Sequence, residues 1–274
     1  MNLHTDAAFT KVHGLVSTLN LNTVCQSAKC PNRHECWNRG TATIMILGDI
    51  CTRDCSFCAV TTGHPAGLDP DEPARVAEAV RSMALKYVVL TSVTRDDLAD
   101  GGASAFAETI RAVRSAVPGI RVEVLTPDFK GIEEHLRTVL DAAPDVFGHN
   151  LETVRRLQPA IRPQASYDCS LSGLRFAATS GGGIAVKSGV MVGLGESDDE
   201  LYEAMRDLRD AGCRLLTLGQ YLAPTRGHVQ PVRFVEPAEF ERYAAKAREL
   251  GFGDVASAPL VRSSYRAEQL WVSG

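Results

Sequence analysis

Three closely spaced cysteines, Cys51, Cys55 and Cys58, are the residues of this sequence best suited to metal chemistry. Three and then two residues separate them, and no fourth cysteine follows nearby. A structural zinc site normally completes its tetrahedron with a fourth Cys or His, so three ligands on one short loop suit zinc poorly. A [4Fe–4S] cluster takes one thiolate per iron, so three cysteines would leave one iron open to the amino and carboxylate groups of a small molecule. The spacing of this downstream triplet therefore favours an iron–sulfur cluster.

An upstream triplet consists of Cys25, Cys30 and Cys36. It lies in a stretch of about 40 N-terminal residues that lacks the regular alternation of apolar and polar runs found later in the chain. Such a segment has little other means of ordering itself, and a bound cluster would supply that order. A zinc knuckle completed by His34 is the alternative for this triplet.

From about residue 41, short apolar runs alternate with amphipathic stretches of helical length, which is typical of repeated βα units around a parallel sheet. The predicted strands are 41–48, 87–93, 121–125, 145–149, 184–192 and 214–220. The predicted helices between them are 73–85, 103–117, 132–142, 167–179 and 198–211. A complete eightfold barrel usually takes ~250 residues, so six units fit the available length better. We therefore predict an α/β fold, a partial (βα)6 TIM-type barrel with N- and C-terminal extensions.

This barrel explains the position of the downstream triplet, because catalytic groups of such folds lie on the loops that follow the strands. Cys51 comes directly after the first predicted strand. We expect three parts: an N-terminal extension with a cluster motif at 1–40, the barrel at 41–250 and a C-terminal extension at 251–274. The two extensions would then lie over the mouth of the barrel.

Charge and composition exclude some partners. A net charge of −4 and a pI near 6.0 give no general attraction to nucleic acid or to anionic lipid. No apolar run approaches the ~18 to 20 residues of a membrane span, and the N-terminus has no signal-peptide core. We therefore expect a cytoplasmic protein with no nucleic-acid or membrane partner, whose cysteines bind metal rather than form disulfides. Cys169 and Cys213, outside the triplets, are expected to be buried, unreactive thiols.

The downstream triplet and its place after a strand resemble the cluster motif of radical S-adenosylmethionine (SAM) enzymes, which cleave SAM to methionine and a 5′-deoxyadenosyl radical. With the upstream triplet and the sequence Arg262-Ser263-Ser264-Tyr265, the arrangement resembles the lipoyl synthase family over nearly the whole chain. Further similar segments are 91–98, 101–102, 122–125, 149–153, 187–189, 193–196 and 219–222. Most of them fall at the carboxyl ends of predicted strands.

The resemblance implies two [4Fe–4S] clusters. The downstream triplet would hold the cluster that cleaves SAM, and the upstream triplet an auxiliary cluster whose fourth iron is bound by the hydroxyl of Ser264. Arg262, in the same motif, is implied as a second catalytic residue. An alkoxide is a harder ligand than a thiolate, so that iron should be the easiest to release, and such a cluster can give up sulfide. On the motif alone, Ser263 and Ser264 would instead be turn or cap residues.

The resemblance also implies a set of SAM contacts. Thr91, Ser92 and Arg95 would face the methionine end, while Lys187 would serve the methionine carboxylate or the substrate. The complete set is Phe57, Thr91, Ser92, Arg95, Glu123, Asn150, Lys187, Gly193, Gly195 and Gln220. Structural alternatives stay open: Phe57 near the adenine also suits a shield over the cluster, and Gly193 and Gly195 also suit a turn.

Two further polar positions belong to this set of expectations. We expect Glu123 and Asn150 at the ends of adjacent strands, where they would bond the ribose hydroxyls or satisfy local backbone. Hydrogen abstraction by a radical requires no proton transfer at carbon, so His149 is expected to be a structural hydrogen-bonding residue rather than an acid.

The implied activity is that of a sulfurtransferase that inserts sulfur at carbons 6 and 8 of an octanoyl chain bound to a carrier-protein lysine. Implied partners are octanoylated lipoyl domains of 2-oxoacid dehydrogenases and glycine cleavage H protein, an electron donor such as ferredoxin or flavodoxin, and an iron–sulfur cluster carrier. Two alternatives remain: another radical SAM enzyme with an auxiliary cluster, such as a methylthiotransferase or a biotin-synthase-like enzyme, or a non-enzymatic metal-binding protein. The Arg-Ser-Ser-Tyr motif argues against the first alternative, and the polar residues at strand ends argue against the second.

Overall fold

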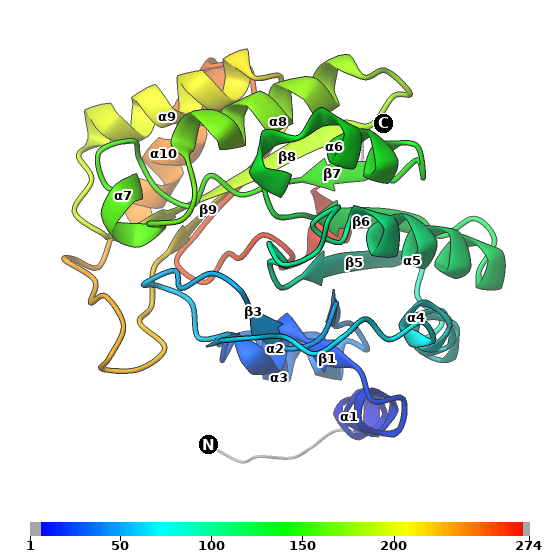
Figure 1. Cartoon of the computed structure of the whole chain (residues 1–274). Helices are drawn as coiled ribbons and strands as arrows, with labels where there is room; N and C mark the ends of the chain where they lie inside the picture. Colours follow the sequence, from blue (N-terminus) through cyan, green and yellow to red (C-terminus); the bar gives the residue numbers. More distant parts are fainter. Residues whose placement is uncertain (1–6, 271–274) are drawn as a thin grey trace.

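A sheet of eight strands forms the centre of the molecule in the computed structural model, which describes residues 7–270 (Figure 1). Seven strands are parallel and neighbour one another in sequence order: β2 (Thr43–Ile46), β5 (Tyr87–Ser92), β6 (Arg121–Leu125), β7 (Val146–Gly148), β8 (Ala185–Val192), β9 (Leu215–Gln220) and β10 (Asp254–Ser257). A two-residue strand, β1 (Asn22–Thr23), pairs antiparallel with β2. Over residues 7–270 the edge strands β1 and β10 do not pair, so the barrel is partial. The predicted fold class is confirmed.

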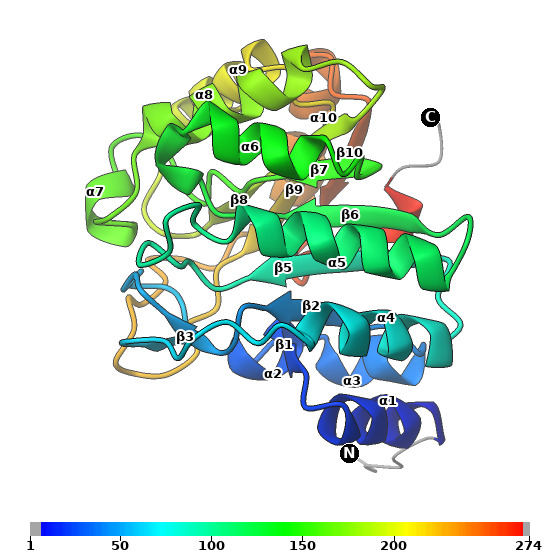
Figure 2. The same ribbon diagram turned by 45° about the vertical axis from the view of Figure 1, so that its right-hand side comes forward.

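Helices cover the outer face of this sheet (Figure 2). They are α4 (Glu72–Ser82), α5 (Ala103–Ala116), α6 (Glu133–Leu140), α8 (Tyr167–Thr179), α9 (Asp198–Asp210) and α10 (Pro237–Glu249). Buried residues recur at helical spacing in each, as Val76 and Val80 do in α4, which gives the helix one apolar face for the strands. A capping box of Ser197 and Glu200 fixes the start of α9. The five predicted helices correspond to the first five of this series.

The last helix and strand, α10 and β10, add one unit to the six that the sequence predicts. β10 pairs in parallel with β9, with Asp254 opposite Leu215 and Ser257 opposite Leu218. All four residues of β10 are half-buried, and so short a strand with polar residues at both ends has no distinct apolar pattern. The sheet therefore continues into the C-terminal segment.

The N-terminal segment folds into helices of its own, α1 (Ala7–Thr18), α2 (Val24–Ser27) and α3 (Arg33–Asn38). The ring of Trp37 is completely buried, with its centroid 5.2 Å from that of Phe9 and 6.0 Å from that of His13. Val12 and Val16 are also buried on α1. The expectation that this segment has little means of order besides a cluster is therefore wrong, because it has an apolar core.

The two faces of the sheet differ in chemistry. On β6, Val122 and Val124 are completely buried and belong to the apolar core, while Glu123 between them points to the opposite face, as strand alternation requires. Buried polar residues recur on other strands, including Thr91 on β5, Lys187 on β8 and Thr217 on β9. Such a polar interior is unusual for a packed barrel and indicates a binding site. None of the described helices is long and apolar enough to cross a membrane.

Candidate functional site

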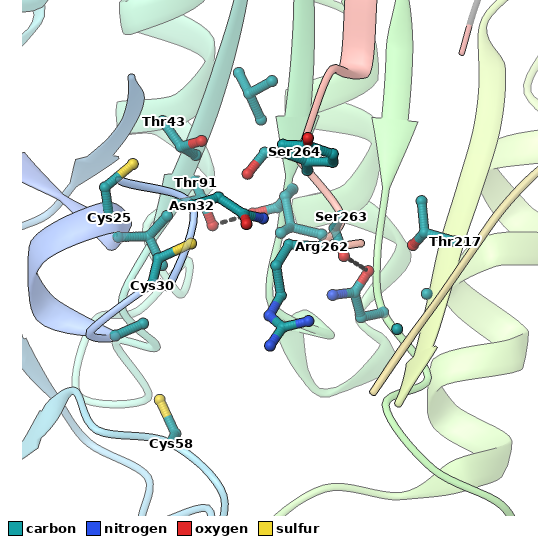
Figure 3. Close-up of a pocket in the computed structure, with 18 of the residues that line it drawn as sticks. Cys25, Cys30, Asn32, Thr43, Cys58, Thr91, Thr217, Arg262, Ser263 and Ser264 are labelled. Atoms are coloured by element: carbon teal, nitrogen blue, oxygen red, sulfur yellow. Dashed lines mark hydrogen bonds between the residues drawn. The ribbon is translucent and has the colours of Figure 1, made fainter. Parts of the chain in front are cut away.

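A cavity of about 500 Å³ opens at the carboxyl side of the parallel strands. It lies between the N-terminal segment and residues 258–270, which we call the tail. All six cysteines of the two triplets line it, together with Arg262, Ser263 and Ser264 of the tail. In Figure 3, Cys25 and Cys30 lie on one side, the three tail residues lie on the other, and Cys58 is farther along the cavity. The fold thus brings both predicted cluster motifs and the Arg-Ser-Ser-Tyr motif to one space.

The downstream triplet begins at the end of a short strand, β3 (Ile50–Cys51), and continues on the loop that leads to a second short parallel strand, β4 (Thr61–Thr62). A buried arginine within the loop, Arg53, ties it to the barrel. Its guanidinium donates two hydrogen bonds of 2.7 Å to Asp128, and it donates to Asp96 at 2.7 and 3.0 Å. Bidentate pairs of this kind fix an arginine in one orientation, so the loop has a defined position between the ends of β5 and β6.

The thiols of the downstream triplet are electrostatically coupled. Burial raises the pKa of Cys58 to about 11, and the neighbouring Cys55 and Cys51 raise it further. Burial also raises the pKa of Cys55, although the guanidinium of Arg162 opposes that shift. Backbone N–H groups of Arg53 and Thr94 donate to Cys51 Sγ at 3.4 Å. Bound iron would supply the positive charge that these thiolates lack.

The upstream triplet is assembled by a turn between two short helices. Cys25 is buried in α2, and its carbonyl accepts a hydrogen bond of 3.2 Å from the backbone N–H of Cys30. Cys36 follows in α3, where burial raises its pKa to about 12 and Cys25 and Cys30 raise it further. The guanidinium of Arg262 lies close enough to Cys30 to lower the pKa of that thiol, against the larger effect of burial. The tail therefore brings a positive charge to this triplet.

His34 does not join the upstream triplet. Its side chain is exposed, its ring packs on Phe9 at 5.5 Å between centroids, and its Nδ1 lies 3.3 Å from Asn38 Nδ2. Over residues 7–270, no three His, Cys, Asp or Glu side chains converge on a point that would hold a single ion. A [4Fe–4S] cube presents its irons at separate corners, so its thiolates need not converge in this way. The soft donors and their arrangement fit iron–sulfur clusters.

The tail is held on two sides. Toward the N-terminal segment, Asn32 Nδ2 donates to the carbonyl of Leu260 at 2.7 Å, and Tyr265 and Arg266 both donate to the carboxylate of Glu35. Toward the barrel, the Ser263 hydroxyl donates to Asn150 Oδ1 at 2.9 Å, as the dashed line in Figure 3 marks. Ser264 lies between these anchors and lines the cavity.

Five residues of the expected SAM set line the cavity: Phe57, Thr91, Ser92, Asn150 and Gln220. The Ser92 hydroxyl is buried and has no hydrogen-bond partner among residues 7–270, so it is available to a ligand. The Thr91 hydroxyl donates to the Leu125 carbonyl, and the Gln220 amide bonds to backbone groups on both its atoms. Ser92 is therefore the clearest open contact of the five.

The other five expected residues, Arg95, Glu123, Lys187, Gly193 and Gly195, do not line the cavity. Arg95 is buried and donates to Asp97 and to the carbonyls of Leu47 and Ala66. The expectation that Glu123 ends its strand is wrong, because it is the third residue of five in β6 and pairs with Lys187 at 2.7 Å. A Cβ on Gly193 would lie 2.3 Å from Gln220 Nε2, so that glycine permits close packing within the loop.

The sequence did not single out two charged residues that line the cavity, Glu152 and Arg162. Glu152 has a left-handed backbone with φ of 72°, and burial raises the pKa of its carboxyl group while Arg162 opposes the shift. Arg162 donates to the carbonyls of Asn150 and Leu151. Glu152 lies within the segment 149–153 that resembles the family, whereas Arg162 has no motif around it.

Three residues outside the cluster motifs follow their predictions in part. His149 Nδ1 lies 2.8 Å from the Thr126 carbonyl, which only accepts, and its Nε2 lies 3.0 Å from Ser170 Oγ. Both ring nitrogens therefore have partners, which agrees with the expected structural role, although the residue also lines the cavity. Cys213 is completely buried, as expected. Cys169 is only half-buried, and neither cysteine lines the cavity.

A family model described as the radical SAM superfamily matches residues 45–208. Lipoyl synthase from Rubrobacter xylanophilus is 58% identical over 251 residues, which cover 92% of this chain and 78% of that protein. Lipoyl synthase from Thermus thermophilus is 56% identical over 272 residues, with coverage of 98% and 84%. Among solved structures, the FeFe-hydrogenase maturase HydG from Carboxydothermus hydrogenoformans matches with a TM-score of 0.62 at 18% identity, over 77% of this chain and 52% of that one. The last likeness concerns the fold alone.

Proposed function

This chain belongs to the lipoyl synthase family of the radical SAM superfamily, and we propose that it inserts sulfur at carbons 6 and 8 of an octanoyl chain carried on a protein lysine. One observation carries the proposal: both cysteine triplets and Ser264 line the same cavity. A carbon radical formed beside one triplet would then be close to the sulfur held by the other. Proximity of this kind replaces diffusion between two sites.

Two cofactor sites follow from the cavity. The downstream triplet would hold one [4Fe–4S] cluster, and the upstream triplet with the Ser264 hydroxyl would hold the second. When bound, these groups would supply the electron that cleaves SAM and the sulfur that enters the substrate. The hydroxyl of Ser264 accepts and donates no hydrogen bond within residues 7–270, which leaves it free to ligate. Arg262, beside Cys30, would balance negative charge on the auxiliary cluster.

The chain's own residues would orient the two substrates. Ser92 and Asn150 line the cavity near the strand ends, and we propose that they contact SAM, with Phe57 packing on its adenine or shielding the cluster. We propose that Thr91 and Gln220 shape the same wall. Apolar residues that line the cavity would accept the octanoyl chain and exclude water: the buried Met45, Val89, Val93 and Val190 and the half-buried Leu125.

The residues of the expected SAM set outside the cavity would act indirectly. We propose that Arg95, Gly193 and Gly195 fix the loops that border the site, because their contacts are to neighbouring loop atoms. Glu123 and Lys187 form a buried ion pair beneath the cavity.

The partners and the division of the chain also remain proposals. We propose that the substrate carriers are lipoyl domains of 2-oxoacid dehydrogenases and glycine cleavage H protein, that ferredoxin or flavodoxin supplies electrons, and that a cluster carrier rebuilds the auxiliary site. The proposed parts are the N-terminal extension 1–40, the barrel 41–250 and the C-terminal extension 251–274. The eight cysteines form no disulfide over residues 7–270, which is compatible with a cytoplasmic location.

Anaerobic incubation of the reconstituted protein with SAM, dithionite and an octanoyl-lysine peptide tests the activity. Mass spectrometry should detect 5′-deoxyadenosine and a peptide that carries two added sulfurs. Cys30→Ala should still form deoxyadenosine but no thiolated peptide, whereas Cys55→Ala should form neither product. Cys169→Ala replaces a cysteine outside the cavity and should retain both products.

The pattern of products separates the alternatives. Deoxyadenosine without thiolated peptide from the unaltered protein would keep the radical chemistry and contradict the octanoyl substrate. About one zinc per chain and no deoxyadenosine would contradict the enzyme altogether.

A further inference from the structure

Lys187 is almost completely buried, yet its ammonium group has two acceptors. Its Nζ donates to Glu123 Oε1 at 2.7 Å and to the backbone carbonyl of Ser263 at 2.6 Å. The hydroxyl of Tyr87 donates to the other carboxylate oxygen of Glu123. Glu123 therefore only accepts and Lys187 only donates, which is the pattern of a carboxylate and an ammonium. Of the three N–H donors of the ammonium group, one binds Glu123 and a second binds the tail.

The acceptor of that bond is well placed to orient Ser264. The carbonyl of Ser263 belongs to the peptide unit that leads into Ser264, and a peptide unit is planar. A donor that holds this carbonyl therefore sets the direction in which the chain enters Ser264. Lys187 reaches it from β8, a strand in the middle of the sheet, over a separation of 76 positions along the chain.

The tail lies against the barrel at the same place. The carbonyl of Val261 approaches β9 so closely that a Cβ on Gly219 would lie 2.1 Å from it. On β8, a Cβ on Gly189 would lie 2.9 Å from the Ser263 hydroxyl. Both glycines leave room for the tail, but among residues 7–270 only Lys187 and Asn150 have side chains that hydrogen-bond to Ser263.

We infer that Lys187 is a positioning residue for the auxiliary site: charged and held by Glu123, it fixes the Ser263 carbonyl so that Ser264 faces the upstream triplet. The inference rests on the proposed role of Ser264 as a ligand. It differs from the role that family resemblance implies for Lys187, which is contact with the SAM carboxylate or the substrate.

The test uses a chain that can hold only the auxiliary cluster, because it carries Cys51→Ala, Cys55→Ala and Cys58→Ala. In this background, Lys187→Met is combined with Glu123→Gln, so that no buried charge is left unpaired and Tyr87 keeps an acceptor. Lys246→Met with Glu249→Gln is the matched control, because it removes a Lys–Glu pair of 2.9 Å at the surface, in which Lys246 is half-buried and Glu249 is exposed. Melting temperatures establish that both variants fold.

Two measurements follow reconstitution under anaerobic conditions. The Mössbauer spectrum, with iron content, reports whether one iron keeps its distinct ligand. Trypsin cleavage after Arg262 or Arg266 reports whether the tail stays docked. We expect the Lys187 variant to lose the distinct iron and to be cleaved in the tail at least about tenfold faster than the control, since local opening exposes the tail.

Any other result counts against the inference on Lys187 or against the proposed auxiliary site. The measurements show which of these two has failed. A Lys187 variant that matches the control in spectrum and cleavage overturns the inference. Loss of SAM binding in the chain with all cysteines, with an unchanged tail, would assign Lys187 to SAM instead. If the control itself holds no cluster, the proposed auxiliary site is wrong, and trypsin cleavage of the metal-free chains still decides whether Lys187 holds the tail.

Discussion

Arg53 shows how one residue can decide the geometry of a metal loop. It lies between Cys51 and Cys55 and is bound by two carboxylates that belong to different parts of the barrel. Burial alone would raise the pKa of Asp128, but the hydrogen bonds from Arg53 outweigh it and lower this pKa to about 2. The same bonds raise the pKa of Arg53 despite its burial. The loop therefore depends on a buried charge pair that neither partner could leave without cost.

We expect Arg53→Met to lower the free energy of unfolding by about 3 to 5 kcal/mol at pH 7, because it leaves a buried carboxylate unpaired. The difference in free energy of unfolding between the two proteins should shrink as the pH falls. Without Arg53, burial raises the pKa of Asp128, and protonation of its carboxyl group removes the unpaired charge. Urea unfolding of the cluster-free proteins at pH 7 and pH 5 measures both effects. Arg81→Met breaks an exposed pair with Glu78 and should cost far less, because solvent screens such a pair. An equal loss in the two variants would contradict the prediction.

His149 makes the stability of the protein depend on pH through burial rather than through hydrogen bonds. Burial lowers its pKa from the usual 6.5 to about 4. Between these values the unfolded chain binds a proton that the native protein does not, so stability is complete above pH 6.5 and falls, by ~3 kcal/mol in all, as the pH decreases to 4. Urea unfolding across this range should show a flatter profile for His149→Gln than for the exposed-residue control His64→Gln. An NMR titration midpoint of His149 near 6.5 would exclude this origin.

At the scale of helices and strands, the glycines of β8 and β9 decide where the tail can lie. Gly219 and Gly189 do not have left-handed backbones. They are suited to these positions because they have no side chain that would collide with the tail. The tail passes over them with its backbone almost in contact with the strands. An element without regular structure is thus positioned by the regular elements beneath it.

Gly219→Ala should displace the tail, because its Cβ would lie 2.1 Å from the Val261 carbonyl, a distance that no contact allows. We expect trypsin to cleave the tail at least about tenfold faster in this variant, while the barrel keeps its circular dichroism spectrum. Gly67→Ala is the control, since its Cβ would meet nothing within 4 Å. Unchanged cleavage in Gly219→Ala would mean that the tail is not held against β9.

The sequence predicts the elements of this fold better than it predicts their contacts. Apolar runs mark the six strands β2 and β5 to β9 because those strands are buried on at least one face. The four half-buried residues of β10 lack that signal. The cysteine spacings likewise predict two cluster motifs, and the fold brings both triplets to one cavity. The pairing of Glu123 with Lys187, by contrast, depends on the register of β6, β7 and β8, which no local pattern encodes. The sequence shows which residue types are present, but the partner of each side chain is known only once the fold is known.

At the scale of the whole molecule, the N-terminal segment and the tail close the cavity together. Asn32, Glu35 and Arg39 of the first bind Leu260, Tyr265, Arg266 and Glu268 of the second. Two of these contacts, Arg266–Glu35 and Arg39–Glu268, are exposed ion pairs, which are individually weak. The barrel beneath them is held by a continuous parallel ladder and a buried apolar core. The cavity is therefore bordered by the stable barrel and by two segments that open more easily, the N-terminal segment and the tail.

Removal of iron should affect these parts differently. After anaerobic chelation of the reconstituted protein, we expect amide hydrogen exchange to rise by about tenfold or more at 24–36 and 258–270, since the ligands no longer tie these segments together. Exchange in β5, β6 and β8 should not change. A chain with Ala in place of the upstream triplet should show no further increase on chelation at these segments. A uniform rise over all strands would mean instead that the clusters stabilise the entire fold.

The bond between Asn32 and Leu260 joins positions that are 228 residues apart along the chain. During synthesis on the ribosome, the upstream cysteines therefore emerge long before Ser264, the serine that we propose as their fourth ligand. A nascent chain that stops short of residue 264 would present three thiols but no fourth ligand. Stable loading of the auxiliary site is thus expected only after translation has passed the tail, so that loading itself distinguishes finished molecules from interrupted ones.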